Sequence, residues 1–88
     1  LCPVKFVQIK NDLYDLNFTS AYHSYFNEEF GNESKATLFL TKNLNKKYHI
    51  DYAFIRGFKI KNFEVGNYSD WIKHSDHMPL IIDIEDQD

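Results

Sequence analysis

One segment, residues 48–55 with the sequence YHIDYAFI, constrains the fold more than any other part of this 88-residue chain. Large apolar side chains recur there at every second position, at Tyr48, Ile50, Tyr52 and Phe54. Because successive side chains of a β-strand point to opposite faces, this alternation predicts a strand with one apolar face. An apolar face needs a second layer to cover it, so the chain is predicted to fold around a sheet.

The composition agrees with a folded chain that is rich in β structure. Hydrophobic residues make up 43% of the sequence and aromatic residues 17%, which is too apolar for a disordered tail. Aromatic side chains are typical of packed strands. At this length the core is small, so the chain is one small domain or a piece of a larger one.

Periodicity and turn residues predict the other elements. Residues 3–16 carry apolar side chains at helical spacing and are predicted as an amphipathic helix, with Pro3 in its first turn. Residues 18–30 are aromatic and ambiguous. Strands are predicted over 36–41 and, after a turn at Gly57, over 58–65, with a polar hairpin loop at 42–47.

The C-terminal third predicts a loop followed by a strand. Residues 66–75 are assigned to the loop, with one helical turn capped by Ser69. Residues 79–84, PLIIDI, form a short apolar run that is typical of a strand buried on both faces. A helix followed by several strands indicates an α+β fold.

The candidate catalytic groups lie in residues 74–80, HSDHMPL, directly before that strand. Pro79 disfavours helix at the preceding residue and holds the turn extended. Asp76 offers a hard oxygen ligand to a divalent cation. His77 can act as an acid or base near neutral pH, or bind a phosphoryl oxygen. Taken alone, such an Asp-His pair is most often a pair of solvated loop residues.

Asp51 is the second candidate, because a carboxylate within an apolar strand is costly unless it is paired. If Asp51 faces His77, it accepts the proton of Nδ1, fixes the tautomer of the ring and favours the imidazolium. The alternative is that Asp51 lies at a sheet edge or bulge and faces solvent. Residue spacing leaves both readings open.

The string YHIDYAFI followed by SDHMPLIIDI resembles the closing signature of the endonuclease/exonuclease/phosphatase superfamily, which includes deoxyribonuclease-like enzymes. SAYHSYFNEEFG and ATLFL resemble bacterial members, so the resemblance covers about residues 13–84. It implies a fragment of a four-layer α/β sandwich, with mostly antiparallel strands and one or two helices. Residues 1–88 would be the C-terminal portion of that domain, with the upstream part absent.

The resemblance also implies a function and its residues. His77 would be the catalytic histidine at the scissile phosphate, Asp76 would bind the metal or position the attacking water, and Asp51 would orient His77. The implied activity is that of a phosphodiester hydrolase dependent on Mg²⁺ or Mn²⁺, with nuclease favoured. Its partner would be nucleic acid or another phosphodiester substrate.

The chain departs from the family pattern at several points. The expected early Asn, metal-binding Glu and Gly-Asp-x-Asn segment are missing; residues 15–17, DLN, lack the preceding Gly. His49 stands where many nucleases of the group have Arg, which puts abasic-site specificity in doubt. The isolated chain is therefore expected to be inactive or nearly so. Half of a sandwich would expose an apolar face, so self-association is also expected.

Charge and cysteine usage limit the remaining classes. A net charge of −3 and a pI near 5.7 do not favour a stand-alone nucleic-acid binder. The single Cys2, the lack of a leader and the lack of a membrane-spanning run predict a cytoplasmic protein. Two alternatives stay open: a non-catalytic interaction module on the same fold, and a phosphoesterase acting on phospholipids or inositol phosphates.

Overall fold

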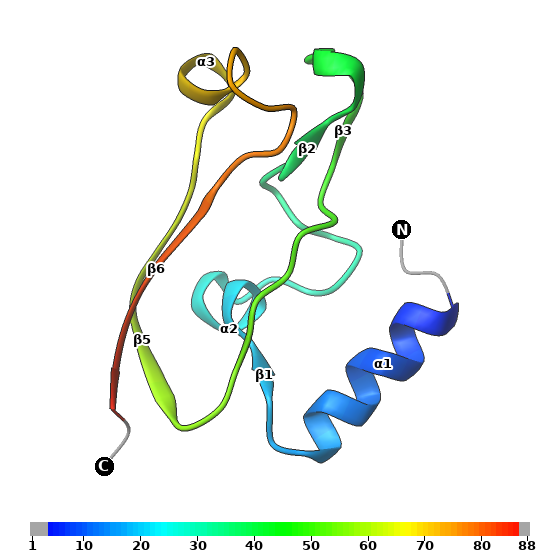
Figure 1. The fold of residues 1–88 in the computed structure, drawn as a ribbon. Coiled ribbons are helices and arrows are strands. Elements are labelled where there is room, and N and C mark those ends of the chain that lie inside the picture. Colours follow the sequence, from blue (N-terminus) through cyan, green and yellow to red (C-terminus); the bar gives the residue numbers. More distant parts are fainter. Residues whose placement is uncertain (1–3, 87–88) are drawn as a thin grey trace.

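A 12-residue helix, α1 (Val4–Asp15), begins the part of the chain that the computed structural model describes, residues 4–86 (Figure 1). Pro3, the first residue of the predicted helix, lies outside the described residues, as does Cys2. The elements that follow are β1 (Thr19–Ser20), α2 (Ala21–Phe26), β2 (Leu38–Phe39), the 3₁₀ helix η1 (Leu40–Lys42), β3 (Lys47–Tyr48), β4 (Phe54–Ile55), β5 (Phe58–Val65), α3 (Tyr68–Trp71) and β6 (Leu80–Asp86).

The strands of residues 4–86 form three antiparallel pairs, β1–β4, β2–β3 and β5–β6. The β5–β6 pair is the longest and has an irregularity in register between Ile60 and Asn62. In Figure 1 this ribbon runs along one side of the molecule, α1 lies on the opposite side, and α2 lies between them. The fold is therefore a small α+β arrangement of antiparallel strands and few helices, as the order of elements predicts.

The core lies where α2 packs against β5. Ala21 and Tyr22 are fully buried, and Phe63 of β5 is only 4% exposed. The rings of Tyr22 and Phe63 meet edge to face, with centroids 5.6 Å apart, a favourable geometry for aromatic pairs. The Tyr22 hydroxyl donates to Glu28 at 2.6 Å. Burial, together with this bond to a carboxylate, raises the pKa of Tyr22 to about 12.

Helix α1 confirms the predicted helix over the described residues, but its apolar stripe is only partly covered. Phe6 stacks on Tyr52 with ring centroids 4.6 Å apart. Ile9 is 56% exposed, and Leu16, just beyond the helix, is also exposed. The chain leaves the helix through Asn17, whose φ of 66° is left-handed, as is common at helix C-termini.

The prediction of one continuous strand over residues 48–55 is wrong. Tyr48 pairs with Leu38 of β2, whereas Phe54 pairs with Ser20 of β1. Residues 49–53 between them belong to no strand, because they cross from one pair of strands to the other. Their backbone groups bond partly to a side chain: the Ile50 amide donates to Thr37 Oγ1 at 3.0 Å. The alternating apolar residues of 48–55 therefore correspond to the ends of two short strands, β3 and β4, and to the segment that connects them.

Two other strand predictions need correction. The strand predicted over 36–41 is limited to β2, because the chain turns into η1, where Thr41 has a φ of 53°. The strand predicted at 79–84 exists as β6 but is not buried on both faces: Ile81 and Ile84 are 45% and 44% exposed. Leu80 and Ile82 pack against the core, whereas Ile81, which points to the other face, is largely open to solvent.

Four local predictions agree with the structure, and the predicted cap of the helical turn is wrong. The strand at 58–65 coincides with β5, and Gly57 before it has a φ of +82°, which glycine adopts without strain. Strands β2 and β3 pair across the predicted hairpin loop. The helical turn α3 is capped by Asn67, whose side chain accepts from the Asp70 amide at 2.9 Å, and not by Ser69.

Candidate functional site

The side chains of His77 and Asp51 meet, as the sequence predicts. His77 Nδ1 lies 2.9 Å from Asp51 Oδ2, across 26 residues of chain. The two side chains are 48% and 36% exposed, so solvent or a substrate can reach them. Because a carboxylate only accepts hydrogen bonds, Nδ1 carries the proton and Nε2 is turned to other partners.

One buried residue, Thr37, holds both halves of this pair in place. Its side-chain Oγ1 accepts from the backbone amides of Ile50 and Asp51, at 3.0 and 3.1 Å. Its carbonyl accepts from the Met78 amide at 2.7 Å, and its own amide donates to the Tyr48 carbonyl at 2.9 Å. Thr37 is fully buried, so these bonds form away from water.

The segment that carries His77 is fixed as a short partner of β2. His77 forms an isolated antiparallel bridge with Leu38. The Phe39 amide donates to the Asp76 carbonyl at 2.8 Å. Ser75 Oγ accepts from the His77 amide at 3.0 Å, and Met78 is 3% exposed. Because the backbone is anchored on both sides of His77, its exposed ring projects from an ordered support.

The charge of the site favours a protonated histidine. The hydrogen bond with Asp51 raises the pKa of His77, and the negative charges of Asp51 and Asp76 act in the same direction, whereas slight burial opposes them. A cationic imidazole near neutral pH can donate a proton or stabilise negative charge on a phosphoryl oxygen.

The predicted metal role of Asp76 lacks support from its neighbours. Within residues 4–86, His, Cys, Asp and Glu side chains gather as a possible metal-binding group of three or more at one place, formed by His23, Glu33 and His49. Asp76 and Asp51 do not belong to it. Mg²⁺ prefers six oxygen ligands in octahedral geometry, so the described residues by themselves do not fit a Mg²⁺ or Mn²⁺ site at Asp76.

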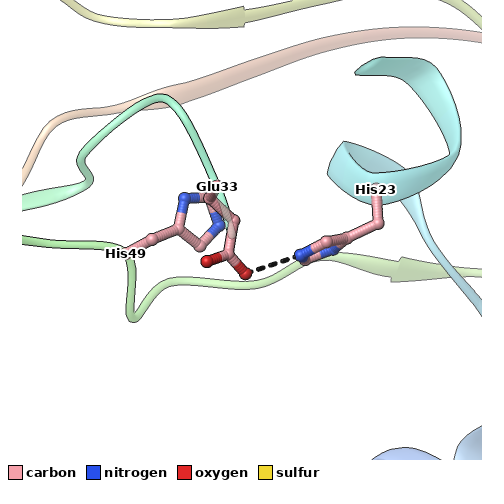
Figure 2. Close-up of side chains that lie close together, drawn as sticks. All are labelled: His23, Glu33 and His49. Atoms are coloured by element: carbon pink, nitrogen blue, oxygen red, sulfur yellow. Dashed lines mark hydrogen bonds and ion pairs between the residues drawn. The ribbon is translucent and has the colours of Figure 1, made fainter. Parts of the chain in front are cut away.

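The His23, Glu33 and His49 cluster is the part of the molecule that sequence reasoning missed (Figure 2). His23 Nε2 lies 2.7 Å from Glu33 Oε2, and His23 Nδ1 lies 2.5 Å from Ser20 Oγ. A weak signal existed in the sequence, since Ser20 and His23 are three residues apart, the spacing of neighbours on a helix. Glu33 and His49 come from other segments, and no local pattern connects them.

Comparisons of the chain with protein-family models, with curated proteins and with solved structures find no match. Among residues 4–86, no helix has both the length and the apolar character needed to span a membrane. The chemistry of the two clusters is therefore inferred from their own geometry.

Proposed function

We propose that this chain carries the histidine side of the active site of a divalent-metal-dependent phosphodiester hydrolase, with a nuclease as the favoured activity. The contact between His77 Nδ1 and Asp51 Oδ2 at 2.9 Å is the observation that carries it. The proposal includes the fold that the sequence resemblance implies. Residues 1–88 would then form the C-terminal portion of a deoxyribonuclease-like four-layer sandwich.

The contact supports a defined chemical role for His77. Asp51 holds Nδ1–H and so orients the ring, as the carboxylate of a hydrolase triad does. The opposite nitrogen of the half-exposed ring is then free to meet a phosphoryl oxygen or a leaving group. General acid–base catalysis of this kind contributes typically about 10²- to 10⁴-fold in rate. In this proposal Asp51 is a positioning residue and His77 is catalytic.

Asp76 has a narrower place in the proposal. It would supply one oxygen to a Mg²⁺ or Mn²⁺ ion, or orient the attacking water, and the remaining metal ligands would come from residues outside this chain. When bound, such an ion offsets the negative charge that develops on the phosphoryl group. The 88-residue chain alone is accordingly expected to show little or no hydrolysis.

The test uses the full-length product of the gene that encodes this chain. Hydrolysis of bis-p-nitrophenyl phosphate and of plasmid DNA is measured in Mg²⁺ and in Mn²⁺. His77→Ala is expected to reduce turnover by about 10²-fold or more, and Asp51→Asn by a smaller factor. His74→Ala, at an exposed histidine three residues before His77, is the control and should retain activity. Unchanged turnover in His77→Ala removes the proposed role.

A second candidate is a non-catalytic interaction module on the same fold. It is favoured by apolar side chains exposed on the β5–β6 ribbon, where Phe58, Ile81 and Ile84 are each at least 40% exposed. Exposed large apolar side chains are available for contact with another protein. Full-length protein that is folded and hydrolyses none of the phosphodiesters in either metal would favour this candidate over the hydrolase.

A further inference from the structure

Three titratable side chains from three separate segments converge beside the core (Figure 2). His23 comes from α2, Glu33 from the loop after it, and His49 from the chain just beyond β3. One ring nitrogen of each histidine and one carboxylate oxygen lie within 4.8 Å of one another. The side chains of His23 and Glu33 are only 5% and 6% exposed. Buried polar groups gathered in this way require partners.

The hydrogen bonds around His49 leave one nitrogen without a partner. Its Nδ1 lies 2.8 Å from the Lys35 carbonyl oxygen, and because a carbonyl only accepts, Nδ1 carries the proton. Nε2 therefore presents a lone pair. This atom is buried and has no hydrogen-bond partner within residues 4–86. An unsatisfied buried acceptor is unfavourable, and a cation is one partner that would satisfy it.

His23 has the same arrangement of supports. Ser20 Oγ lies at its Nδ1, so Nε2 is the nitrogen that faces Glu33. Histidines that bind metals usually hold the second ring nitrogen in a hydrogen bond to an oxygen, which fixes the orientation of the ring. Here Ser20 Oγ and the Lys35 carbonyl provide such oxygens for His23 and His49. The Nε2 atoms of His23 and His49 are thereby the nitrogens that point toward the centre of the cluster.

Aromatic side chains hold the two imidazoles in position. His23 stacks on Phe30, with ring centroids 3.7 Å apart and planes inclined by 13°. His49 packs against Tyr22 with centroids 4.4 Å apart. An apolar shell limits the access of water and strengthens electrostatic interactions inside it.

Glu33 is suited to act as an anionic ligand. Its Oε2 lies 2.7 Å from His23 Nε2 and accepts from the Gly31 amide at 3.2 Å, and these two contacts hold the carboxylate beside the imidazoles. Two neutral imidazoles and one carboxylate form a ligand set found at catalytic zinc sites.

We propose that His23, Glu33 and His49 bind a transition-metal cation, Zn²⁺ in particular. Imidazole ligands favour Zn²⁺ over Mg²⁺, which prefers oxygen. A tetrahedral site with bonds of about 2.0 Å places its ligand atoms about 3.3 Å apart. The present separations are 2.7 Å between His23 Nε2 and Glu33 Oε2 and at most 4.8 Å within the group, a range that includes that value.

Binding would change the tautomer of His23. Without a cation, Nε2–H donates to Glu33, and the Ser20 hydroxyl donates to Nδ1. With Zn²⁺ on Nε2, the ring proton moves to Nδ1 and donates to Ser20 Oγ. A hydroxyl both donates and accepts, so Ser20 serves either state without moving.

A cavity lies next to two of the three side chains. A hollow of about 270 Å³ borders the cluster and is lined by both Glu33 and His49, together with Gly31, Lys35 and Tyr48 among other residues. Three protein ligands with one open position are typical of zinc sites that bind water or a small ligand. This cluster shares no residue with His77, Asp76 and Asp51, so its metal binding is tested independently of the proposed hydrolase.

The test measures Zn²⁺ binding to the 88-residue chain by isothermal titration calorimetry. A Cys2→Ser background removes the thiol as a competing ligand. We expect a single Zn²⁺ per chain. His49→Phe keeps an aromatic ring against Tyr22, and Glu33→Gln keeps the shape of the side chain, and each should weaken binding by about tenfold or more. His74→Gln, an exposed histidine outside the cluster, should bind as the parent does.

Nitrogen-15 NMR of the histidine rings gives a readout that needs no substitution in the cluster. On addition of Zn²⁺, the Nε2 resonances of His23 and His49 should shift as metal-bound nitrogens, and the proton of His23 should be found on Nδ1. Far-UV circular dichroism identifies any variant that does not fold. The proposal is overturned if the chain binds no stoichiometric Zn²⁺, if binding survives in both folded variants, or if the shifts occur at other histidines.

Discussion

The Thr37 carbonyl accepts a hydrogen bond from the Met78 amide at 2.7 Å, and this bond sets the position of His77. On the opposite side, Thr37 Oγ1 accepts the Asp51 amide at 3.1 Å. A single buried residue is therefore hydrogen-bonded both to the segment that carries His77 and to the segment that carries Asp51. The geometry of the candidate active site depends on a residue that itself offers no catalytic chemistry.

Replacing Thr37 by Val should show how much the side-chain hydroxyl of Thr37 contributes to the stability of the fold. Valine keeps the branched shape but removes the acceptor of the Ile50 and Asp51 amides, and each unpaired buried amide costs about 1–3 kcal/mol. We expect the free energy of unfolding in urea to fall by that order. Thr41→Ala, at an exposed position, should change it by less than about 0.5 kcal/mol. Equal effects of the two substitutions would show that the Thr37 hydroxyl is unimportant.

The pKa of His77 should depend on Asp51. The pKa is raised in the folded chain, first by the hydrogen bond with Asp51, so Asp51→Asn should return it toward the ordinary value of histidine in an NMR titration. Asp76 acts only through its charge, and Asp76→Asn should lower it less. Because the folded pKa is raised, the stabilisation is complete below the ordinary histidine pKa and is lost as pH rises through the folded value. A pKa insensitive to Asp51 would contradict the observed contact.

The carboxylate of Glu28 should make the free energy of unfolding depend on pH at acidic pH. Hydrogen bonds from the Ser34 hydroxyl, the Tyr22 hydroxyl and the Ser34 amide lower the pKa of its carboxyl group from 4.5 to about 2. Since the folded pKa is depressed, the stabilisation is present above pH 4.5 and is lost as pH falls toward 2. The stability difference between the parent and Glu28→Gln should therefore shrink across this window. Glu29→Gln, at an exposed neighbour, should show no such trend.

Gly66 should tolerate no side chain. A Cβ atom there would lie 2.5 Å from Pro79 Cδ and 2.8 Å from Trp71 Cδ1, closer than van der Waals contact. Gly66→Ala should destabilise the fold by about 1–3 kcal/mol, as overpacking typically does. Gly57 has open space but a φ of +82°, so Gly57→Asn, which adopts positive φ more readily than most residues, should cost less. The two midpoints in urea decide the comparison.

The exposed apolar residues of β6 should promote self-association of the 88-residue chain. Ile81 and Ile84 are 45% and 44% exposed, and burying them between copies would remove apolar surface from water. Sedimentation velocity should show a mass that grows with concentration, and Ile81→Lys should reduce it. Lys59→Ala, at an exposed charged position of the neighbouring β5, should not. A monomer at every concentration would contradict this expectation.

Local sequence determined those elements whose causes are local. Helix α1 follows from apolar spacing, β5 from apolar side chains interspersed with polar ones after Gly57, and the turn from the conformational freedom of Gly57, whose φ is positive in the structure. The contact of Asp51 with His77 was also predictable. A carboxylate among apolar neighbours needs a partner, and His77 was the partner proposed for it, although residue spacing alone left a solvent-facing Asp51 open.

Tertiary structure decided the rest, because the causes lie far apart in the chain. The alternation at 48–55 specifies apolar faces but not the strands that pair with them. One end of the segment pairs with β2 and the other with β1. The apolar run of β6 specifies hydrophobicity but not how many neighbours cover it. His23, Glu33 and His49 are each ordinary in their local sequence. They become a cluster only when three segments fold against one another, and contact across such distances is a property of packing.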